Sequence, residues 1–286
     1  MSCACCETAV VKNAGVALFA TAMCIVWGTR GLFVGGPKTT GTSSRTWWRV
    51  LKLVLKSVLV IFVSALVLVS LILVACHGSR RVRERFFAAL VSRHALAPSL
   101  DEYRCETLGL SNATGTVVEF GPGPGSNFRC LGQVSDWVGV EPNEKFRKAQ
   151  DKEALARNVT FRRRTVWLKG ETVDLDETFD NAILTHVLCS VEDPRAVLLT
   201  ALGSLRTGGT LFVMEHVRAH DERESYYQDL FAPFFYVLGN GCQFRDTRTI
   251  LEEMNDSFSF NMLKTQHIPT MPLPLRPHLF ARATKI

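Results

Sequence analysis

The first hundred residues contain almost no acidic side chains: two Asp or Glu stand against twelve Lys or Arg. Residues 101–286 lack that basic excess, with 21 basic against 25 acidic side chains. An enzyme that acts on nucleic acid usually carries positive charge on its folded domain to neutralise phosphates, and here the positive charge lies elsewhere. We therefore expect no nucleic-acid partner.

The composition is neither that of a disordered polyelectrolyte nor that of a fibrous repeat, because 47% of the 286 residues are apolar and only 21% are charged. A chain of this length has room for one full-sized domain with appendages. The sequence thus predicts a packed globule with additional segments.

The nine cysteines include no pair of C-x-x-C motifs of the kind that holds structural zinc, and we expect no metal. Their odd number and scattered positions favour reduced thiols facing the cytosol over a disulfide framework. Three N-x-[ST] sequons, at Asn112, Asn158 and Asn255, would suit a lumenal domain, but such triplets also arise by chance.

A run of twenty residues without a charge extends from Ser57 to Cys76. At 1.5 Å per residue it is long enough to cross a hydrocarbon core of roughly 30 Å. Its uniform Val, Leu and Ile content leaves no polar face, which favours a transmembrane helix over a core helix. We predict four regions: a basic N-terminal segment (1–56), the transmembrane helix (57–76), a juxtamembrane linker with a helix around Arg83–His94 (77–110), and a folded domain (111–286).

The segment before this run leaves several questions open. The shorter apolar stretch Ala14–Thr29 fits a signal-like segment, a re-entrant hairpin half or a second span. Basic residues flank the long run on both sides, so the positive-inside rule is close to a tie. Cys3, Cys5 and Cys6 are either palmitoylated or ordinary exposed thiols.

Beyond residue 110, short apolar runs alternate with amphipathic segments, which predicts an α/β sheet whose first half is parallel. In such sheets ligands bind at the carboxyl ends of the strands. We expect strands at Thr116–Phe120, Asp136–Glu141, Thr178–Thr185, Thr210–His216, Met262–His267 and Leu279–Thr284, and helices near Asn143–Ala156, Asp193–Arg206 and Thr247–Ser257.

A glycine-rich loop follows the first predicted strand directly, in Glu119-Phe-Gly-Pro-Gly-Pro-Gly125. Glycines let the backbone turn sharply and approach a ligand closely. The spacing is G-x-G-x-G, whereas a dinucleotide loop has G-x-G-x-x-G, and residue 126 is Ser. Glu141 ends the next strand, where a Rossmann-like half-sheet places the acid that receives ribose hydroxyls.

Together these elements resemble the class I S-adenosylmethionine-dependent methyltransferases, a Rossmann-like fold whose first motif is E/D-x-G-x-G-x-G. The segments Val187-Leu-Cys-Ser-Val191, Met214-Glu-His-Val217, Gly241-Cys242, Gln266-His-Ile268 and Arg276-Pro-His278 more narrowly resemble the methyltransferase-like 7 proteins, which are membrane-anchored thiol S-methyltransferases. The resemblance implies that S-adenosylmethionine is bound through Glu119, Gly121, Gly123, Gly125, Glu141, Glu171, Thr185 and His186.

The chain departs from that family at several places. Pro122 and Pro124 stand where the family has Cys and Thr, and prolines lack the N–H that a cofactor could use. Glu141 replaces an Asp, and Glu171 matches its segment only with one residue inserted. His186 replaces an apolar residue. Because His186 and His216 end adjacent strands, we expect them beside the acceptor as catalytic residues.

These features predict a membrane-anchored methyltransferase acting on a small apolar acceptor, in particular a thiol. The alternatives are a lipid, sterol or quinone methyltransferase, or a membrane or lipid-droplet protein that binds S-adenosylmethionine without turnover. Six aromatics between Tyr226 and Tyr236 suggest an apolar substrate lid, with core packing as the competing interpretation. We expect a monomer in contact with membrane lipids, on the endoplasmic reticulum or lipid droplets with a cytosolic catalytic domain, or else on a mitochondrial membrane.

Overall fold

The computed structural model describes residues 42–93 and 100–286. The chain divides into two compact units, residues 1–79 and 80–286. In the first unit, helix α2 (Thr42–Gly78) contains the whole uncharged run. Val60, Ile61 and Leu71 on this helix are more than three-fifths exposed, whereas a core helix would have them covered. Among the described residues, α2 is the one helix long and apolar enough to cross a membrane.

Several predictions concern residues outside the described ranges. The apolar stretch 14–29 and the cysteines at 3, 5 and 6 lie within 1–41, and the end of the linker helix beyond residue 93 lies within 94–99. These stay predictions, and so do the limits of the four regions.

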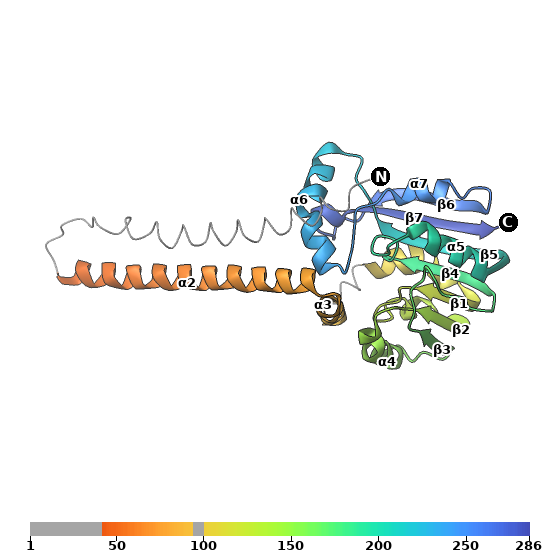
Figure 1. The fold of residues 1–286 in the computed structure, drawn as a ribbon, viewed down its shortest axis with the longest axis horizontal. Helices are drawn as coiled ribbons and strands as arrows, with labels where there is room; N and C mark the ends of the chain where they lie inside the picture. The colour runs from red at the N-terminus through yellow and green to blue at the C-terminus, as the bar shows by residue number, and fades with distance from the viewer. Residues whose placement is uncertain (1–41, 94–99) are drawn as a thin grey trace. The chain divides into compact units, whose positions relative to one another are not determined.

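The second unit is built on a seven-stranded sheet with the order β3-β2-β1-β4-β5-β7-β6. Figure 1 shows these strands side by side, with β3 at one edge and β6 at the other. The strands are β1 (Thr114–Phe120), β2 (Gln133–Val140), β3 (Arg162–Val166), β4 (Phe179–Thr185), β5 (Leu205–His216), β6 (Phe258–His267) and β7 (Pro277–Lys285).

Parallel pairing joins β3, β2, β1, β4 and β5, and β7 runs antiparallel between β5 and β6. The predicted α/β sheet with a parallel first half is therefore confirmed. The strand order reverses between β1 and β4, so the chain leaves their carboxyl ends in opposite directions. This reversal opens the crevice in which such sheets bind ligands.

Helices and short helical turns connect the strands. Asp193 begins α5 by accepting the N–H groups of Arg195 and Ala196, and Asp221 begins α6 by accepting that of Glu224. The α-helices are α3 (Arg80–Arg93), α4 (Arg147–Ala156), α5 (Pro194–Ser204), α6 (Glu222–Leu238) and α7 (Thr247–Glu252); single turns are η2 (Tyr103–Thr107), η3 (Leu110–Asn112), η4 (Phe128–Cys130), η5 (Glu144–Phe146) and η6 (Leu273–Leu275).

Both faces of the sheet are covered by apolar side chains. Successive strand residues point to opposite faces, so Val117 and Val118 of β1 are both fully buried but belong to different apolar clusters. Ile183 and Leu184 of β4 divide in the same way. A sheet buried on both faces explains the continuous apolar runs in its central strands.

Strand β3 has no counterpart among the strands that we expected from hydrophobic pattern. Its sequence, RRRTV, has the charge of a solvated loop, and its three arginines are exposed. Neighbouring acids compensate them: Arg162 lies opposite Asp136 on β2 and forms an ion pair with it at 2.7 Å. β3 is an edge strand and pairs with a neighbouring strand on only one side, so its residues need not follow the hydrophobic pattern of a central strand.

Several expected boundaries were wrong. The predicted helix Asp193–Arg206 ends at Ser204, because Leu205 already pairs with Phe179 of β4. The predicted helix over 247–257 ends at Glu252, and the chain turns so that Phe258 starts β6 fully buried. β6 thus begins four residues before the expected strand, through an irregular register near Phe260.

A disulfide joins Cys105 to Cys130, across 25 residues of sequence. The expectation that all cysteines are reduced is therefore wrong for this pair. The sequence carries no spacing signal for it, since the two residues meet only because turns η2 and η4 pack together. Cys189 and Cys242 are buried thiols outside this disulfide.

Candidate active site

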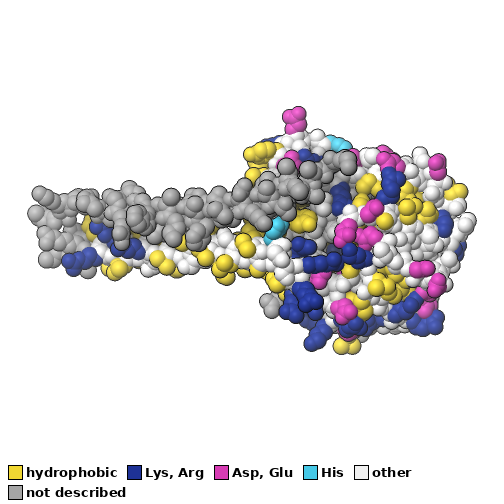
Figure 2. All heavy atoms as spheres, in the orientation of Figure 1, with side chains coloured by type: hydrophobic (Ala, Val, Ile, Leu, Met, Phe, Trp, Pro, Cys, Tyr) yellow, Lys and Arg dark blue, Asp and Glu magenta, His cyan; other side chains and the backbone are white. Residues whose placement is uncertain are grey.

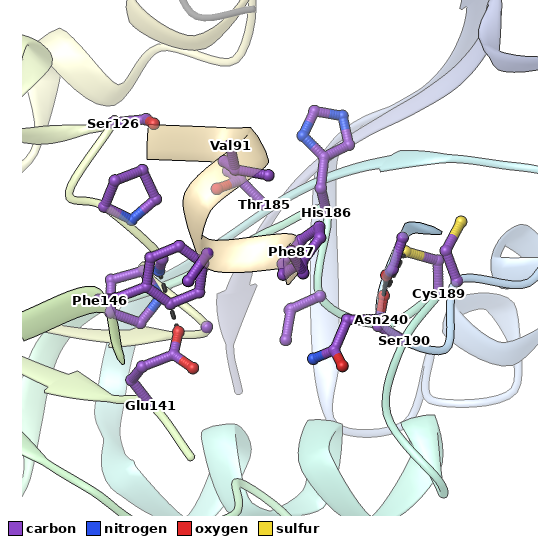
Figure 3. A pocket seen from close by; sticks show the side chains of 18 of the residues that line it. Phe87, Val91, Ser126, Glu141, Phe146, Thr185, His186, Cys189, Ser190 and Asn240 are labelled. Carbon is purple, nitrogen blue, oxygen red and sulfur yellow. Dashed lines mark hydrogen bonds between the residues drawn. The ribbon is translucent and has the colours of Figure 1, made fainter. Parts of the chain in front are cut away.

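A cavity of about 1180 Å³ lies at the carboxyl ends of β1, β2, β4 and β5. This is the position that the reversal of strand order predicts. In Figure 3, Glu141 and Phe146 lie on one side of it, and Cys189, Ser190 and Asn240 lie on the other. The cavity is large enough for two small molecules bound next to each other.

Helix α3 forms one wall of this cavity, which hydrophobic pattern alone did not indicate. Figure 3 shows Phe87 and Val91 of α3 among the side chains that line the cavity. The Phe87 and Phe146 rings contact each other edge-on, with their centroids 5.9 Å apart. Asn143 donates its side-chain N–H to the carbonyl of Glu84 at 3.0 Å. The helix that follows α2 in sequence is thus part of the binding site.

The glycine loop after β1 follows the predicted motif, and its three glycines serve different purposes. All three have positive φ, which L side chains adopt at a cost. A Cβ on Gly121 would lie 2.6 Å from Val187, and one on Gly125 would lie 2.5 Å from Phe128. A Cβ on Gly123 would meet only Phe146, at 3.9 Å. Gly123 therefore leaves open space facing the cavity, whereas Gly121 and Gly125 are required by packing.

Glu141 follows β2 directly and reaches the glycine loop. Its carboxylate accepts the N–H of Gly123 at 3.0 Å and that of Asn143 at 2.9 Å. Burial raises its pKa to about 7, against the effect of these two hydrogen bonds. The structure thus brings the loop and the acid of the sequence motif into direct contact, as the spacing predicts.

Glu119 occupies a different position from the other motif residues. It is 1% exposed, and its two oxygens accept hydrogen bonds from Trp137 at 2.9 Å and from Asn127 at 2.8 Å. It is not among the described residues that line the cavity, and neither is Gly125. Burial raises the pKa of Glu119 to about 7. Its geometry is that of a residue that holds the loop through Asn127.

Glu171 and Thr185 both line the cavity. Glu171 accepts the N–H of Glu192 at 2.9 Å, which joins the loop after β3 to the loop after β4. Thr185 accepts a hydrogen bond from Asn127 at 2.9 Å. Asn127, which lies just after the Glu119–Gly125 motif, therefore connects Glu119 to the cavity wall.

Three histidines converge at the other side of the cavity. His186 has φ +55°, a strained value for a residue with a side chain, and its N–H is held by the carbonyl of Met214 at 2.8 Å. Its Nε2 lies 3.0 Å from Nε2 of His278. The ring of His216 lies 5.6 Å from that of His186. The structure thus brings together both predicted catalytic residues and adds His278.

Hydrogen bonding determines which ring nitrogens of His186 and His278 carry protons. His278 Nδ1 lies 3.1 Å from the carbonyl of Arg276, which can only accept, so Nδ1 carries the proton. His278 Nε2 must then accept from His186 Nε2–H, which leaves the lone pair of His186 on Nδ1. Burial lowers the pKa of His278 to about 4 and that of His186 well below 6.5. Both rings are therefore neutral at physiological pH.

Two cysteines join His216 in a group that the sequence did not predict. The ligand atoms of Cys189, His216 and Cys242 all lie within 4.8 Å of one another, and all three residues are buried. They come from the loop after β4, the end of β5 and the loop after α6. No local motif could show this group, because each member is separated from the next by a complete strand or helix.

Similarity to known proteins identifies the family. A family model described as a methyltransferase domain matches residues 83–265, which include most of the residues that line the cavity. The chain belongs to the class I S-adenosylmethionine-dependent methyltransferases. Its methyl donor is thus S-adenosylmethionine.

Two human relatives match more than half of this chain. Thiol S-methyltransferase TMT1B from Homo sapiens is 34% identical over 183 residues, which are 62% of this chain and 74% of the relative. Thiol S-methyltransferase TMT1A from Homo sapiens is 33% identical over 178 residues, covering 59% and 70%. The predicted resemblance to a thiol S-methyltransferase family is confirmed.

Solved structures confirm the fold. The N-methyltransferase NodS from Bradyrhizobium japonicum, in complex with S-adenosyl-L-homocysteine, superimposes with a TM-score of 0.50 over 66% of this chain and 88% of its own. The two share 15% of their residues, so this likeness concerns the Rossmann-like architecture of the methyltransferase alone.

Proposed function

We propose that this methyltransferase transfers the methyl group of S-adenosylmethionine to a small apolar thiol. The observation that carries the proposal is the identity of 34% and 33% to two relatives named thiol S-methyltransferases, over 62% and 59% of this chain. The cavity has room for the acceptor beside the cofactor, and its far side carries the histidines and cysteines.

The cofactor is proposed to lie along the glycine loop. Gly123 provides the open space, Glu141 receives the ribose hydroxyls, and Glu171 lies where related sheets hold the base. Gly121, Gly125 and Glu119 shape the loop by packing and hydrogen bonding. Thr185 and His186 line the wall between cofactor and acceptor.

Methyl transfer from a sulfonium is an in-line displacement, so the enzyme chiefly aligns the two molecules and excludes water. A thiol reacts as its thiolate, yet only a few per cent is ionised at neutral pH because its pKa is about 8.5. We propose that Nδ1 of His186, which carries the lone pair, receives the thiol proton. His216 lies beside it and forms the same wall.

Membrane attachment is proposed through α2. The basic residues Arg80, Arg81 and Arg85 at the start of α3 are exposed and follow α2 directly, so they lie within reach of anionic head groups, at about 1 kcal/mol per residue. Figure 2 shows Lys and Arg side chains gathered where Figure 1 labels α3. We propose the endoplasmic reticulum or lipid droplets, with a mitochondrial membrane as the alternative.

Two kinds of observation bear on which side of the membrane the enzyme faces. Synthesis of S-adenosylmethionine in the cytosol favours a cytosolic catalytic domain. The Cys105–Cys130 disulfide favours an oxidising compartment, and the sequons at Asn112, Asn158 and Asn255 are all exposed. We propose the cytosolic orientation, in which none of the three sequons carries sugar. A mobility shift on glycosidase treatment that disappears in Asn112→Gln or Asn158→Gln would place the domain in the lumen instead.

A lipid acceptor is the second candidate, and helix α6 favours it. Tyr226, Phe231 and Phe234 on this helix are at least 40% exposed, so core packing does not account for them. α6 packs against α3, the helix that continues from α2. Of the six aromatics in the predicted lid, Phe235 and Tyr236 line the cavity. An acceptor could thus enter from the bilayer along α6.

Radiolabelled S-adenosylmethionine with panels of alkyl thiols, lipids, sterols and quinones tests the proposal on the full chain in detergent. We expect label in the thiol panel, abolished by Gly123→Val and retained by the exposed-loop variant Gly132→Ala. Label confined to a lipid, sterol or quinone would establish the second candidate. Binding of S-adenosylmethionine without label in any panel would indicate a protein without turnover.

A further inference from the structure

The group formed by Cys189, His216 and Cys242 has the composition of a metal site. Two sulfurs and one imidazole nitrogen form a donor set that suits zinc, a borderline-soft ion. The three side chains are between 2% and 7% exposed, although each carries a polar group. Nothing in the methyl-transfer chemistry derived above requires two thiols at this point, so the cluster needs its own explanation.

The distances are close to those of a tetrahedral site. Zinc bound at about 2.3 Å to sulfur and about 2.0 Å to nitrogen separates its ligand atoms by roughly 3.5–3.8 Å. The three ligand atoms here lie within 4.8 Å of one another, and His216 Nε2 is 2.8 Å from Cys242 Sγ. To bind an ion, the distance between His216 Nε2 and Cys242 Sγ must therefore increase by less than about 1 Å.

The backbone around the cluster holds the two cysteine loops in place. The N–H of Gln243 donates to the carbonyl of Cys189 at 2.9 Å, which joins the loop after β4 to the loop after α6. Glu215 accepts the N–H groups of Val187 at 2.6 Å and Leu188 at 2.8 Å. Such supporting hydrogen bonds orient metal ligands in known sites.

We propose that Cys189, His216 and Cys242 bind a zinc ion whose fourth coordination position takes the sulfur of the thiol acceptor. Three protein ligands leave a tetrahedral ion one open position, which distinguishes a catalytic site from a closed structural one. All three residues line the cavity. His278 does not occupy the fourth position, because it is paired with His186 and its ring lies 6.2 Å from that of His216.

This inference rests on the proposed thiol acceptor and adds a means of activating it. On binding, the thiol transfers its proton to Nδ1 of His186, the acceptor proposed above, and the metal keeps the sulfur as a thiolate at neutral pH. The thiolate electron pair then forms a bond to the methyl carbon of S-adenosylmethionine. The bond from that carbon to the sulfonium breaks with its electron pair, leaving S-adenosylhomocysteine. The neutral thioether product is a weaker ligand and dissociates.

Cobalt(II) is the probe, because its thiolate complexes absorb where zinc is silent. The full chain, purified in detergent under reducing conditions, is analysed for zinc by mass spectrometry and then reconstituted with cobalt. We expect about one ion per chain and a thiolate-to-cobalt charge-transfer band. Cys242→Ser and Cys189→Ser should each weaken metal binding at least tenfold, whereas Cys76→Ser, in the other unit, should not change it. Unfolding curves of each variant check that the fold persists.

A second titration tests the open position. Adding an alkyl thiol to the cobalt protein should shift the charge-transfer band, and the alcohol of the same chain length should not. Zinc and cobalt both absent from the wild-type protein, or a Cys189–Cys242 disulfide as its native state in peptide mapping, would refute the metal site. A cobalt spectrum that does not change when thiol is added would refute the binding of the acceptor sulfur at the fourth position.

The outcomes also separate this inference from the proposed function. Thiol methylation at an undiminished rate by metal-free protein would leave the proposed function intact and reject the zinc site. If the protein holds one metal ion per chain but methylates only a lipid, the metal site would be supported. The thiol acceptor and its coordination to the metal would both be rejected.

Discussion

Removal of the Glu141 carboxylate provides the sharpest test of the cofactor site. In the structure this group accepts two backbone N–H bonds, from Gly123 and Asn143. Ribose hydroxyls are expected to donate to the same oxygens. A hydrogen bond to a charged group contributes about 1.5–3 kcal/mol, so Glu141→Ala should weaken binding of S-adenosylmethionine roughly ten- to hundredfold.

Alanine also leaves the buried N–H of Asn143 without an acceptor, at about 1–3 kcal/mol, so the free energy of unfolding must be measured alongside. Glu141→Gln retains one acceptor oxygen and should preserve the fold better while still weakening binding. Glu144→Gln, an exposed acid three residues further on, is the matched control. We expect its affinity to equal that of the wild type.

The pKa of Glu141, raised to about 7 by burial, adds a pH signature. If the ionised carboxylate is the form that accepts the ribose hydroxyls, about one tenth of the protein is competent at pH 6 and about nine tenths at pH 8. The dissociation constant should therefore fall roughly tenfold between these pH values, and Glu141→Gln should lose this dependence. Calorimetry with S-adenosylhomocysteine measures both. Equal affinities for wild type and both variants, or a pH dependence that survives in Glu141→Gln, would refute the assignment.

Three further predictions concern the fold, the loop and the membrane. Burial raises the pKa of Glu119 from 4.5 to about 7, so ionisation of this group destabilises the folded state as the pH rises through this window. Between pH 5 and 8 the wild type should lose roughly 2–3 kcal/mol more of its free energy of unfolding than Glu119→Gln, measured by guanidinium unfolding. Equal pH dependence of the free energy of unfolding in the two proteins would contradict this. Gly123→Val should abolish cofactor binding in calorimetry, since the φ of +53° strains a β-branched residue and its side chain fills the open space, whereas Gly132→Ala should bind normally. The full chain should stay in the membrane on carbonate extraction, because α2 anchors it. Residues 80–286 alone should be released by carbonate and should still bind S-adenosylhomocysteine. Release of the full chain by carbonate would show that α2 is not an anchor.

Local sequence determined the features that depend on neighbours in the chain. The run from Ser57 to Cys76 predicts an apolar helix because a continuous run leaves no polar face. The motif from Glu119 to Gly125 predicts a strand followed by a tight turn, since glycine alone tolerates the positive φ without strain. Parallel strands end at one edge of a sheet, so Glu141 was expected beside the loop, and it hydrogen-bonds to Gly123.

Tertiary structure alone decided the features that depend on distant segments. Strand β3 exists because Arg162–Val166 pairs with β2, although its arginines have the composition of a loop. The disulfide Cys105–Cys130 forms because two short turns pack together.

The same holds for the acceptor side of the cavity. His186 and His278 are 92 residues apart in sequence and 3.0 Å apart in space. Cys189, His216 and Cys242 meet only once β4, β5 and the segment after α6 are in place. Periodicity and spacing describe neighbours within a segment, whereas these contacts are set by the order of strands in the sheet, which burial of apolar surface on both of its faces selects.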